Sequence, residues 1–182
     1  MASVEHCAAC HNQHTTVDQW RAAPEERRGE NCLACHMPEV RREAGRVGRD
    51  HSFRASHDLV ALQSAVRLAG GNDAEGVWVE VENSGAGHHF PTDERSRAAD
   101  VQVRWQDGQG GWSDWENLYR FRQPYRDETH LQDTLLPAAA TWLGRPAPPP
   151  GAQSGEARLL YRTNPYLPDA EARELHRVPL KP

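Results

Sequence analysis

The chain has 182 residues, of which 37% are hydrophobic, and its formal net charge at pH 7 is −5. This length suits one ordinary domain or two small ones, and the composition is typical of a soluble protein with a modest core. The negative charge supplies no polybasic surface, so nucleic acid is not an expected partner. No apolar run approaches the roughly 20 residues that a membrane-spanning helix needs.

Two copies of the pentapeptide CxxCH, CAACH at 7–11 and CLACH at 32–36, use all four cysteines of the chain. CxxCH is the attachment signal of c-type haem. Both thiols of a copy bond to the vinyl groups of one porphyrin, and the histidine that follows binds the iron. We therefore expect two covalent haem c groups. The attachment residues are Cys7, Cys10, Cys32 and Cys35, and the proximal iron ligands are His11 and His36.

The same four cysteines also come close to a zinc-ribbon spacing, in which roughly twenty residues separate two CxxC pairs. In that interpretation the histidine after each pair has no role. Two disulfides, or a redox-active dithiol, would likewise need neither His11 nor His36. Haem attachment uses both histidines, so we prefer it to these alternatives.

The first part of the chain is expected to form short helices around the porphyrins. One helix is predicted over residues 17–28, interrupted or begun afresh at Pro24. A second is predicted to begin after Ser56 as its N-cap and to end at Gly70 and Gly71. We expect one face of this helix to cover a haem or the junction with the next domain. Its apolar residues recur at three- and four-residue steps: Leu59, Leu62, Val66 and Ala69.

After about residue 72 the sequence alternates apolar and polar residues, which is typical of half-buried strands. Short strands separated by Gly and Pro favour an antiparallel β-sandwich. We therefore expect an α+β fold, with a small helical or irregular dihaem-binding domain at 1–72 and a β-sandwich domain at 73–182. Strands are predicted at 77–82, 101–106, 116–122, 134–143 and 156–162, with a turn at 107–111 and an extended proline-rich loop at 145–150.

Each iron needs a sixth ligand on the face opposite its proximal histidine. Met37 directly follows His36 and cannot reach the other face of that haem, and Met1 is terminal. Histidine is therefore the expected sixth ligand at both irons. The candidates, of which two are needed, are His6, His14, His51, His57, His88, His89, His130 and His176.

Three segments resemble the multihaem c-type cytochromes: CLACHMP at 32–38, HSF at 51–53 and ENSGAGHHFPT at 82–92. In that family a CxxCHMP haem site is followed by a His-x-Phe segment. A β-rich domain then opens with Asn-x-Gly-Ala-Gly-His-x-x-Pro-Thr. The resemblance extends over roughly residues 5–165, and its third segment is the most specific part.

The resemblance implies that His88, presented by the β-rich domain, is one distal iron ligand and that His51 is the other. The loop around His88 agrees with this role, because Gly85 and Gly87 let the backbone come close to a porphyrin. His57, at the start of the predicted second helix, is the alternative to His51.

Two six-coordinate haems close together favour electron transfer between redox partners over catalysis. The expected partners are other redox proteins or cytochromes. Self-association into a haem conduit and membership of a larger multihaem complex are further options. The alternative function is a haem enzyme with an open iron site for nitrite, hydroxylamine or sulfite. Such an enzyme generally pairs its open haem with a pocket of activating side chains, which residues 1–72 do not suggest.

Haem is attached to CxxCH outside the cytoplasm in bacteria, so we expect a periplasmic or extracellular location. Residues 1–5 lack the apolar core of a signal peptide. The chain is therefore expected to be a processed or recombinant form, or a portion of a longer cytochrome.

The two motifs predict that the denatured protein is heavier than its polypeptide by two haem groups, because thioether bonds survive denaturation. Intact-protein mass spectrometry measures this mass, and the pyridine haemochrome spectrum should be of the c type. An unmodified mass together with bound zinc would show that the cysteines form a metal site instead.

Overall fold

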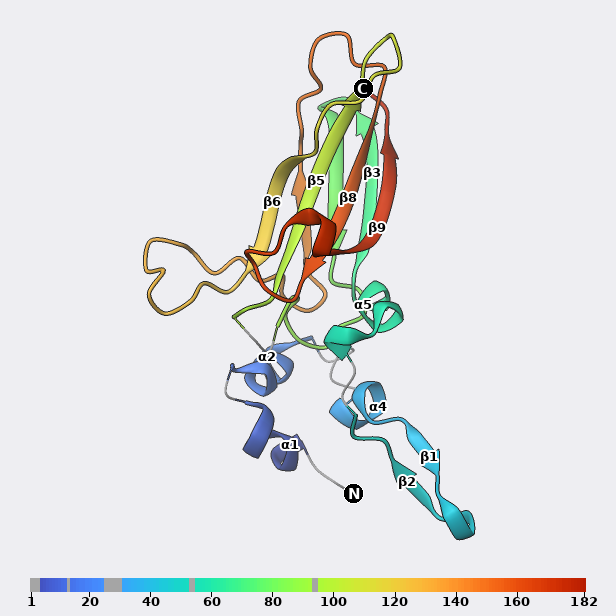
Figure 1. Cartoon of the computed structure of the whole chain (residues 1–182). Coiled ribbons are helices and arrows are strands. Elements are labelled where there is room, and N and C mark those ends of the chain that lie inside the picture. Colours follow the sequence, from blue (N-terminus) through green and yellow to red (C-terminus); the bar gives the residue numbers. More distant parts are fainter. Residues whose placement is uncertain (1–3, 13, 25–30, 53–54, 93–94) are drawn as a thin grey trace.

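The computed structural model combines short helices with antiparallel sheets and confirms the predicted α+β class. In Figure 1 the helices α1 (Val4–His11), α2 (Thr16–Ala22) and α4 (Cys32–His36) lie beyond one end of a β-sandwich, whose other end holds the C-terminus. None of the helices within the described ranges is long and apolar enough to cross a membrane. The structure describes residues 4–12, 14–24, 31–52, 55–92 and 95–182.

The sandwich consists of a three-stranded sheet in the order β3-β4-β7 and a four-stranded sheet in the order β6-β5-β8-β9. All the strand pairs are antiparallel. The predicted strands at 77–82, 101–106, 116–122 and 156–162 are confirmed, whereas β3 and β9 were not predicted. The strands are β3 (Arg67–Asp73), β4 (Gly76–Glu82), β5 (Ala98–Gln106), β6 (Glu116–Arg122), β7 (Thr141–Gly144), β8 (Ser154–Arg162) and β9 (Arg173–Leu180).

A separate hairpin joins β1 (Glu39–Arg41) to β2 (Val47–Arg49) directly after α4. The remaining elements are short. They are the helix α5 (Leu59–Ala65) and the 3-10 turns η1 (Glu43–Gly45), η2 (Ala55–His57) and η3 (Asp169–Glu171).

Alternation along β4 builds one wall of the sandwich core. Val77, Val79 and Val81 are at most 3% exposed, while the residues between them are only half-buried on the other face of the sheet. Successive side chains of a strand point to opposite faces, so this spacing places all three valines in the core. Each buried valine stabilises the fold by about 1.5–3 kcal/mol relative to an exposed one.

The central strand β5 is buried on both faces. The Asp100 carboxylate on this strand therefore needs a partner of opposite charge. The two oxygens of Asp100 accept hydrogen bonds from Arg120 at 2.6 and 2.8 Å, and one of them also accepts from Arg162 at 2.7 Å. The carboxylate is fully buried, and these two guanidinium groups compensate for its loss of solvent.

The second predicted helix begins later than expected. Its N-cap is Asp58, not Ser56, because the Asp58 carboxylate accepts hydrogen bonds from the amides of Val60 at 2.9 Å and Ala61 at 3.1 Å. These are two of the amides that lack a partner inside the helix, and capping them stabilises it by about 1 kcal/mol.

The same helix also ends earlier than predicted. Val66 has extended backbone angles, φ −137° and ψ 155°, and the chain then enters β3, which contains Gly70 and Gly71. Leu68 pairs with Val81 and is buried in the core. Pairing with β4 therefore overrides the helical spacing of the apolar residues.

Two further predictions are corrected, and one is left open. The first predicted helix ends at Ala22, and residues 25–28 lie outside the described residues. The strand predicted at 134–143 is reduced to Thr141–Gly144, because Ala139 takes a positive φ of 60° and interrupts it. The predicted domain boundary at 72 and 73 falls inside β3, and the division into two domains stays a prediction.

Replacing Asp100 by Ala should lower the free energy of unfolding by about 3–5 kcal/mol, because buried positive charge would lose its compensating carboxylate. The matched control is Glu82→Ala. It removes the surface pair with Arg67 and should cost less than about 1 kcal/mol. Urea denaturation measures both losses, and equal losses would show that the Asp100 cluster is not a central stabilising feature.

Candidate functional site

A cavity of about 770 Å³ lies between the N-terminal helices and the near end of the sandwich. Both CxxCH motifs contribute to its wall, and so does the loop that follows β4. The volume falls within the range of cofactor pockets. The motif residues on the wall are Cys7, His11, Cys32, Cys35 and His36, and the loop residues are Gly85 to Thr92.

Each motif lies on its own short helix, α1 or α4, with its histidine as the last helical residue. The three motif side chains are at positions i, i+3 and i+4, so helical spacing turns them to one face. Helix α4 is capped by Asn31, whose side-chain oxygen accepts hydrogen bonds from the amides of Leu33 at 3.0 Å and Ala34 at 3.3 Å.

The two motifs lie next to each other. Burial raises the pKa of the Cys32 thiol, and the neighbouring Cys7 raises that pKa further through charge repulsion and a hydrogen bond. The first cysteines of the two motifs thus line the same cavity, although 24 residues separate them in the chain.

Each motif histidine faces one of the histidines predicted as distal ligands. The ring centres of His11 and His51 are 6.1 Å apart, and those of His36 and His88 are also 6.1 Å apart. An imidazole nitrogen binds a first-row metal at about 2 Å. The ring centre lies roughly 1 Å further out, so two rings on opposite sides of one metal have centres about 6 Å apart. Both pairs therefore fit an iron held between two histidines.

The two pairs differ in the orientation of their rings. The planes of His11 and His51 make an angle of 70°, whereas those of His36 and His88 are nearly parallel, at 14°. The pairs are therefore distinguishable by any measurement that is sensitive to ring orientation.

The loop that presents His88 is fixed by a buried asparagine. The Asn83 amide donates hydrogen bonds to the carbonyl oxygens of His88 at 2.8 Å and Leu136 at 3.0 Å. Asn83 itself is fully buried, so both bonds are shielded from water. The asparagine of the segment ENSGAGHHFPT at 82–92 thus holds the loop that carries His88 against the sandwich.

The same loop packs tightly on α5. The Gly85 amide donates to the Ala65 carbonyl at 2.9 Å, and a Cβ atom at Gly85 would lie 1.9 Å from the Ser64 carbonyl oxygen. Only glycine permits this approach. The predicted closeness of Gly85 to a porphyrin stays a prediction, and the approach to α5 is a second reason for a glycine at this position.

A hydrogen bond sets the tautomer of His88. Its Nδ1 lies 2.9 Å from the carbonyl oxygen of His89, which can only accept, so Nδ1 carries the proton. The lone pair is then on Nε2. Metal-binding histidines commonly donate their other ring nitrogen to a carbonyl in this way.

Gln19 ties the N-terminal helices to this loop, and sequence reasoning missed it. Its side-chain oxygen accepts hydrogen bonds from the Thr92 hydroxyl at 2.7 Å and from the His89 amide at 3.3 Å. The side chain is 8% exposed, although it is polar and lies on the short helix α2. A polar residue within a short helix gives no sequence signal for such a contact.

Other candidate histidines have different surroundings. His57 is exposed and is not among the described residues that line the cavity. The Nε2 of His176 lies 2.9 Å from the Val66 carbonyl and serves the packing of β9 on α5. His89 lines the cavity, and burial lowers its pKa, while Asp133 acts in the opposite direction.

In the described part of the chain, no three His, Cys, Asp or Glu side chains converge as ligands for a bare metal ion. His11, His36 and His88 line the cavity, and His51 lies beside His11. A porphyrin brings four nitrogens of its own, so a pair of histidines would complete the coordination of a haem iron.

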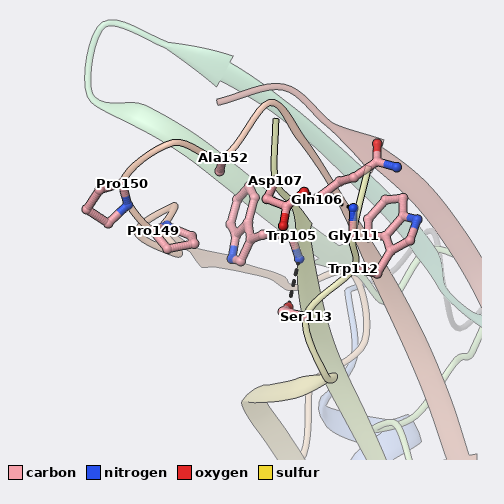
Figure 2. Close-up of a pocket in the computed structure, with 9 residues that line it drawn as sticks. All are labelled: Trp105, Gln106, Asp107, Gly111, Trp112, Ser113, Pro149, Pro150 and Ala152. Atoms are coloured by element: carbon pink, nitrogen blue, oxygen red, sulfur yellow. Dashed lines mark hydrogen bonds between the residues drawn. The ribbon is translucent and has the colours of Figure 1, made fainter. Parts of the chain in front are cut away.

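A second cavity, of about 260 Å³, lies far from the motifs where β5 turns towards β6 (Figure 2). Trp105, Trp112 and Pro149 line it. The Asp107 carboxylate accepts hydrogen bonds from turn amides, including that of Gly111 at 2.8 Å. This polar group therefore serves the turn, and the cavity is a feature of the loop structure.

A scan against protein-family models finds no match, and a search of curated proteins also finds none. Among solved structures, the chain is similar to the penta-haem cytochrome c552 from Thermochromatium tepidum, with a TM-score of 0.71 and 19% sequence identity. The two chains share a fold. The match covers 96% of this chain and 55% of that one, so the chain spans about half the length of the cytochrome. The fold implied by the resemblance to multihaem cytochromes is thus confirmed.

Replacing Gly85 by Ala should destabilise the protein by about 1–3 kcal/mol, because the added Cβ overpacks the contact with α5. Gly108→Ala is the control, since a Cβ there meets nothing nearer than 4.0 Å. Thermal unfolding of both variants measures the difference. If Gly85→Ala were as stable as the control, the loop would not depend on this contact.

Proposed function

We propose that the chain is a dihaem c-type cytochrome that transfers electrons between redox partners. The observation that carries this proposal is the pair of histidine–histidine arrangements, each with ring centres 6.1 Å apart and each built on a CxxCH histidine. When bound, haem supplies a one-electron couple between ferric and ferrous iron. The protein residues hold, orient and cover that group.

In this proposal Cys7 and Cys10 attach one haem, and Cys32 and Cys35 attach the other. His11 with His51 would hold the iron of the first haem, and His36 with His88 would hold that of the second. His51 is preferred to His57 because the ring centre of His51 lies 6.1 Å from that of His11. Both histidines are exposed, and neither is among the described residues that line the cavity, so exposure does not separate them. The sandwich contributes the fourth ligand through the loop that Asn83 holds.

Ligand number favours electron transfer over catalysis. A histidine on each side of an iron fills the positions at which nitrite, hydroxylamine or sulfite would bind. Bis-histidine ligation also favours low reduction potentials, because methionine ligation is what raises them. An electron carrier needs such closed and rigid coordination.

Cys7 and Cys32 line the same cavity, which supports rapid exchange between the two haems. In this proposal the two residues would anchor different haems at one cavity. We further propose a periplasmic or extracellular location, with other redox proteins as partners. Because the chain covers 55% of a penta-haem cytochrome, it also suits a segment of a larger haem assembly.

Replacing His51 or His88 by Ala should each turn one haem from low-spin to high-spin, because each variant removes one axial nitrogen. Absorption spectra of the oxidised and reduced protein measure the change. His57→Ala is the control and should leave both haems low-spin. If the His57 variant had a high-spin haem and the His51 variant did not, His57 and not His51 would be the iron ligand.

The wild-type reduced protein should bind no carbon monoxide at neutral pH and should exchange electrons rapidly with an electrode. The physical reason is that both axial positions of each iron are filled. Stoichiometric carbon monoxide binding, together with turnover of nitrite, hydroxylamine or sulfite, would contradict electron transfer and favour an enzyme.

A further inference from the structure

The hairpin β1–β2 extends away from α4 and from the sandwich in Figure 1. Its strands are antiparallel, with Arg41 opposite Val47 and Val40 opposite Gly48. Ala44 and Gly45 both take a positive φ, of 59° and 71°, which lets a short turn join the strands. Neither the proposed haem ligation nor the sandwich core uses this hairpin.

The hairpin is basic although the chain is acidic. It has four arginines and two glutamates, whereas the whole chain has a formal net charge of −5. One glutamate, Glu39, is paired with Arg49 at 3.3 Å. All four arginines are exposed, so their charge faces the solvent. They are Arg41, Arg42, Arg46 and Arg49.

The two faces of the hairpin are not equivalent. Arg42 lies across Gly48, where an added Cβ would meet its Nε at 2.5 Å, and Arg42 donates a hydrogen bond to the Arg49 carbonyl at 3.2 Å. That face is therefore covered by its own side chain. The opposite face presents Arg41 beside Val47, which is 65% exposed. Exposed valine next to arginine is typical of interaction surfaces, where arginine is enriched.

The hairpin is tied directly to the helix of the second motif. Arg49 donates hydrogen bonds to the carbonyl oxygens of Met37 at 3.0 Å and Leu33 at 3.5 Å, at the C-terminal end of α4. The Leu33 carbonyl also accepts a hydrogen bond from the Met37 amide at 3.1 Å, and a cation at this end interacts favourably with the helix dipole. Arg49 therefore fixes the inner end of the hairpin beside α4, whose last residue is His36, while Arg41, Arg46 and Val47 lie at the outer end.

We propose that the exposed outer end of the hairpin, with Arg41, Arg46 and Val47, is a docking face for an acidic redox protein, which exchanges electrons through the haem attached at 32–36. This inference rests on the proposed function and specifies the chemistry of its partner. Two acidic proteins repel each other over most of their surfaces. A local basic arm steers an acidic partner to the side of the molecule on which the hairpin joins α4.

The test compares the double variant R41E/R46E with the wild type in its haem-loaded form. The donor is reduced plant-type ferredoxin, which is acidic, and stopped-flow absorption measures the rate constant of electron exchange. At low ionic strength the variant should be about tenfold slower or more, because steering becomes repulsion. The difference should shrink at about 0.5 M salt, where charges are screened.

Two controls make the result specific. The variant R126E/K181E has the same change in net charge at exposed positions outside the hairpin and should lose less than about half of its rate. A zwitterionic viologen should reduce all three proteins equally fast. Equal slowing of both variants by ferredoxin, or no slowing of R41E/R46E, would overturn the proposed docking face.

Failure of the proposed function gives a different result. If the viologen could not reduce the wild type, electron transfer itself would be wrong, and the docking proposal would fall with it. Sedimentation of the wild type and of R41E/R46E at low salt tests a second occupant. A wild-type dimer that the variant abolishes would assign the face to another copy of this chain and overturn the redox-partner proposal.

Discussion

Two histidine pairs set the arrangement of the N-terminal part of the chain. They bring together residues that are distant in sequence, His11 with His51 and His36 with His88, each with ring centres 6.1 Å apart. Few apolar side chains in the described part of residues 4–65 are buried, namely Val17, Ala23 and Leu62. Such a segment buries little apolar surface of its own, so two haems, one at each histidine pair, would supply the missing core.

The sandwich gives this segment a rigid support. Its own core is continuous, and the loop that carries His88 is fixed to it through the buried Asn83 and the tight approach of Gly85 to α5. Gln19 then ties the N-terminal helices to the same loop. A ligand on a rigid element holds its geometry better than one on a mobile loop, and electron transfer requires little rearrangement of the site.

Most of the strands could be predicted from the sequence, because alternation is a local signal: alternating valines define β4. CxxCH is also a local signal, and it predicts an attachment chemistry whatever its surroundings. Other features depend on contacts that local patterns do not encode. The helical spacing of the apolar residues continues to Ala69, yet pairing of Leu68 with Val81 places residues 67–73 in β3. The burial of Gln19 and the pairing of His51 with His11 likewise arise from distant segments.

The central claim, that each histidine pair holds one haem iron, is tested most directly by electron paramagnetic resonance of the oxidised, haem-loaded protein at low temperature. The ring planes make angles of 70° and 14°, and ring orientation decides the shape of a low-spin ferric signal. We predict one rhombic low-spin signal from the nearly parallel pair and one signal with a large maximal g value from the twisted pair. Two signals of the same shape, or a high-spin signal from either iron, would contradict the account.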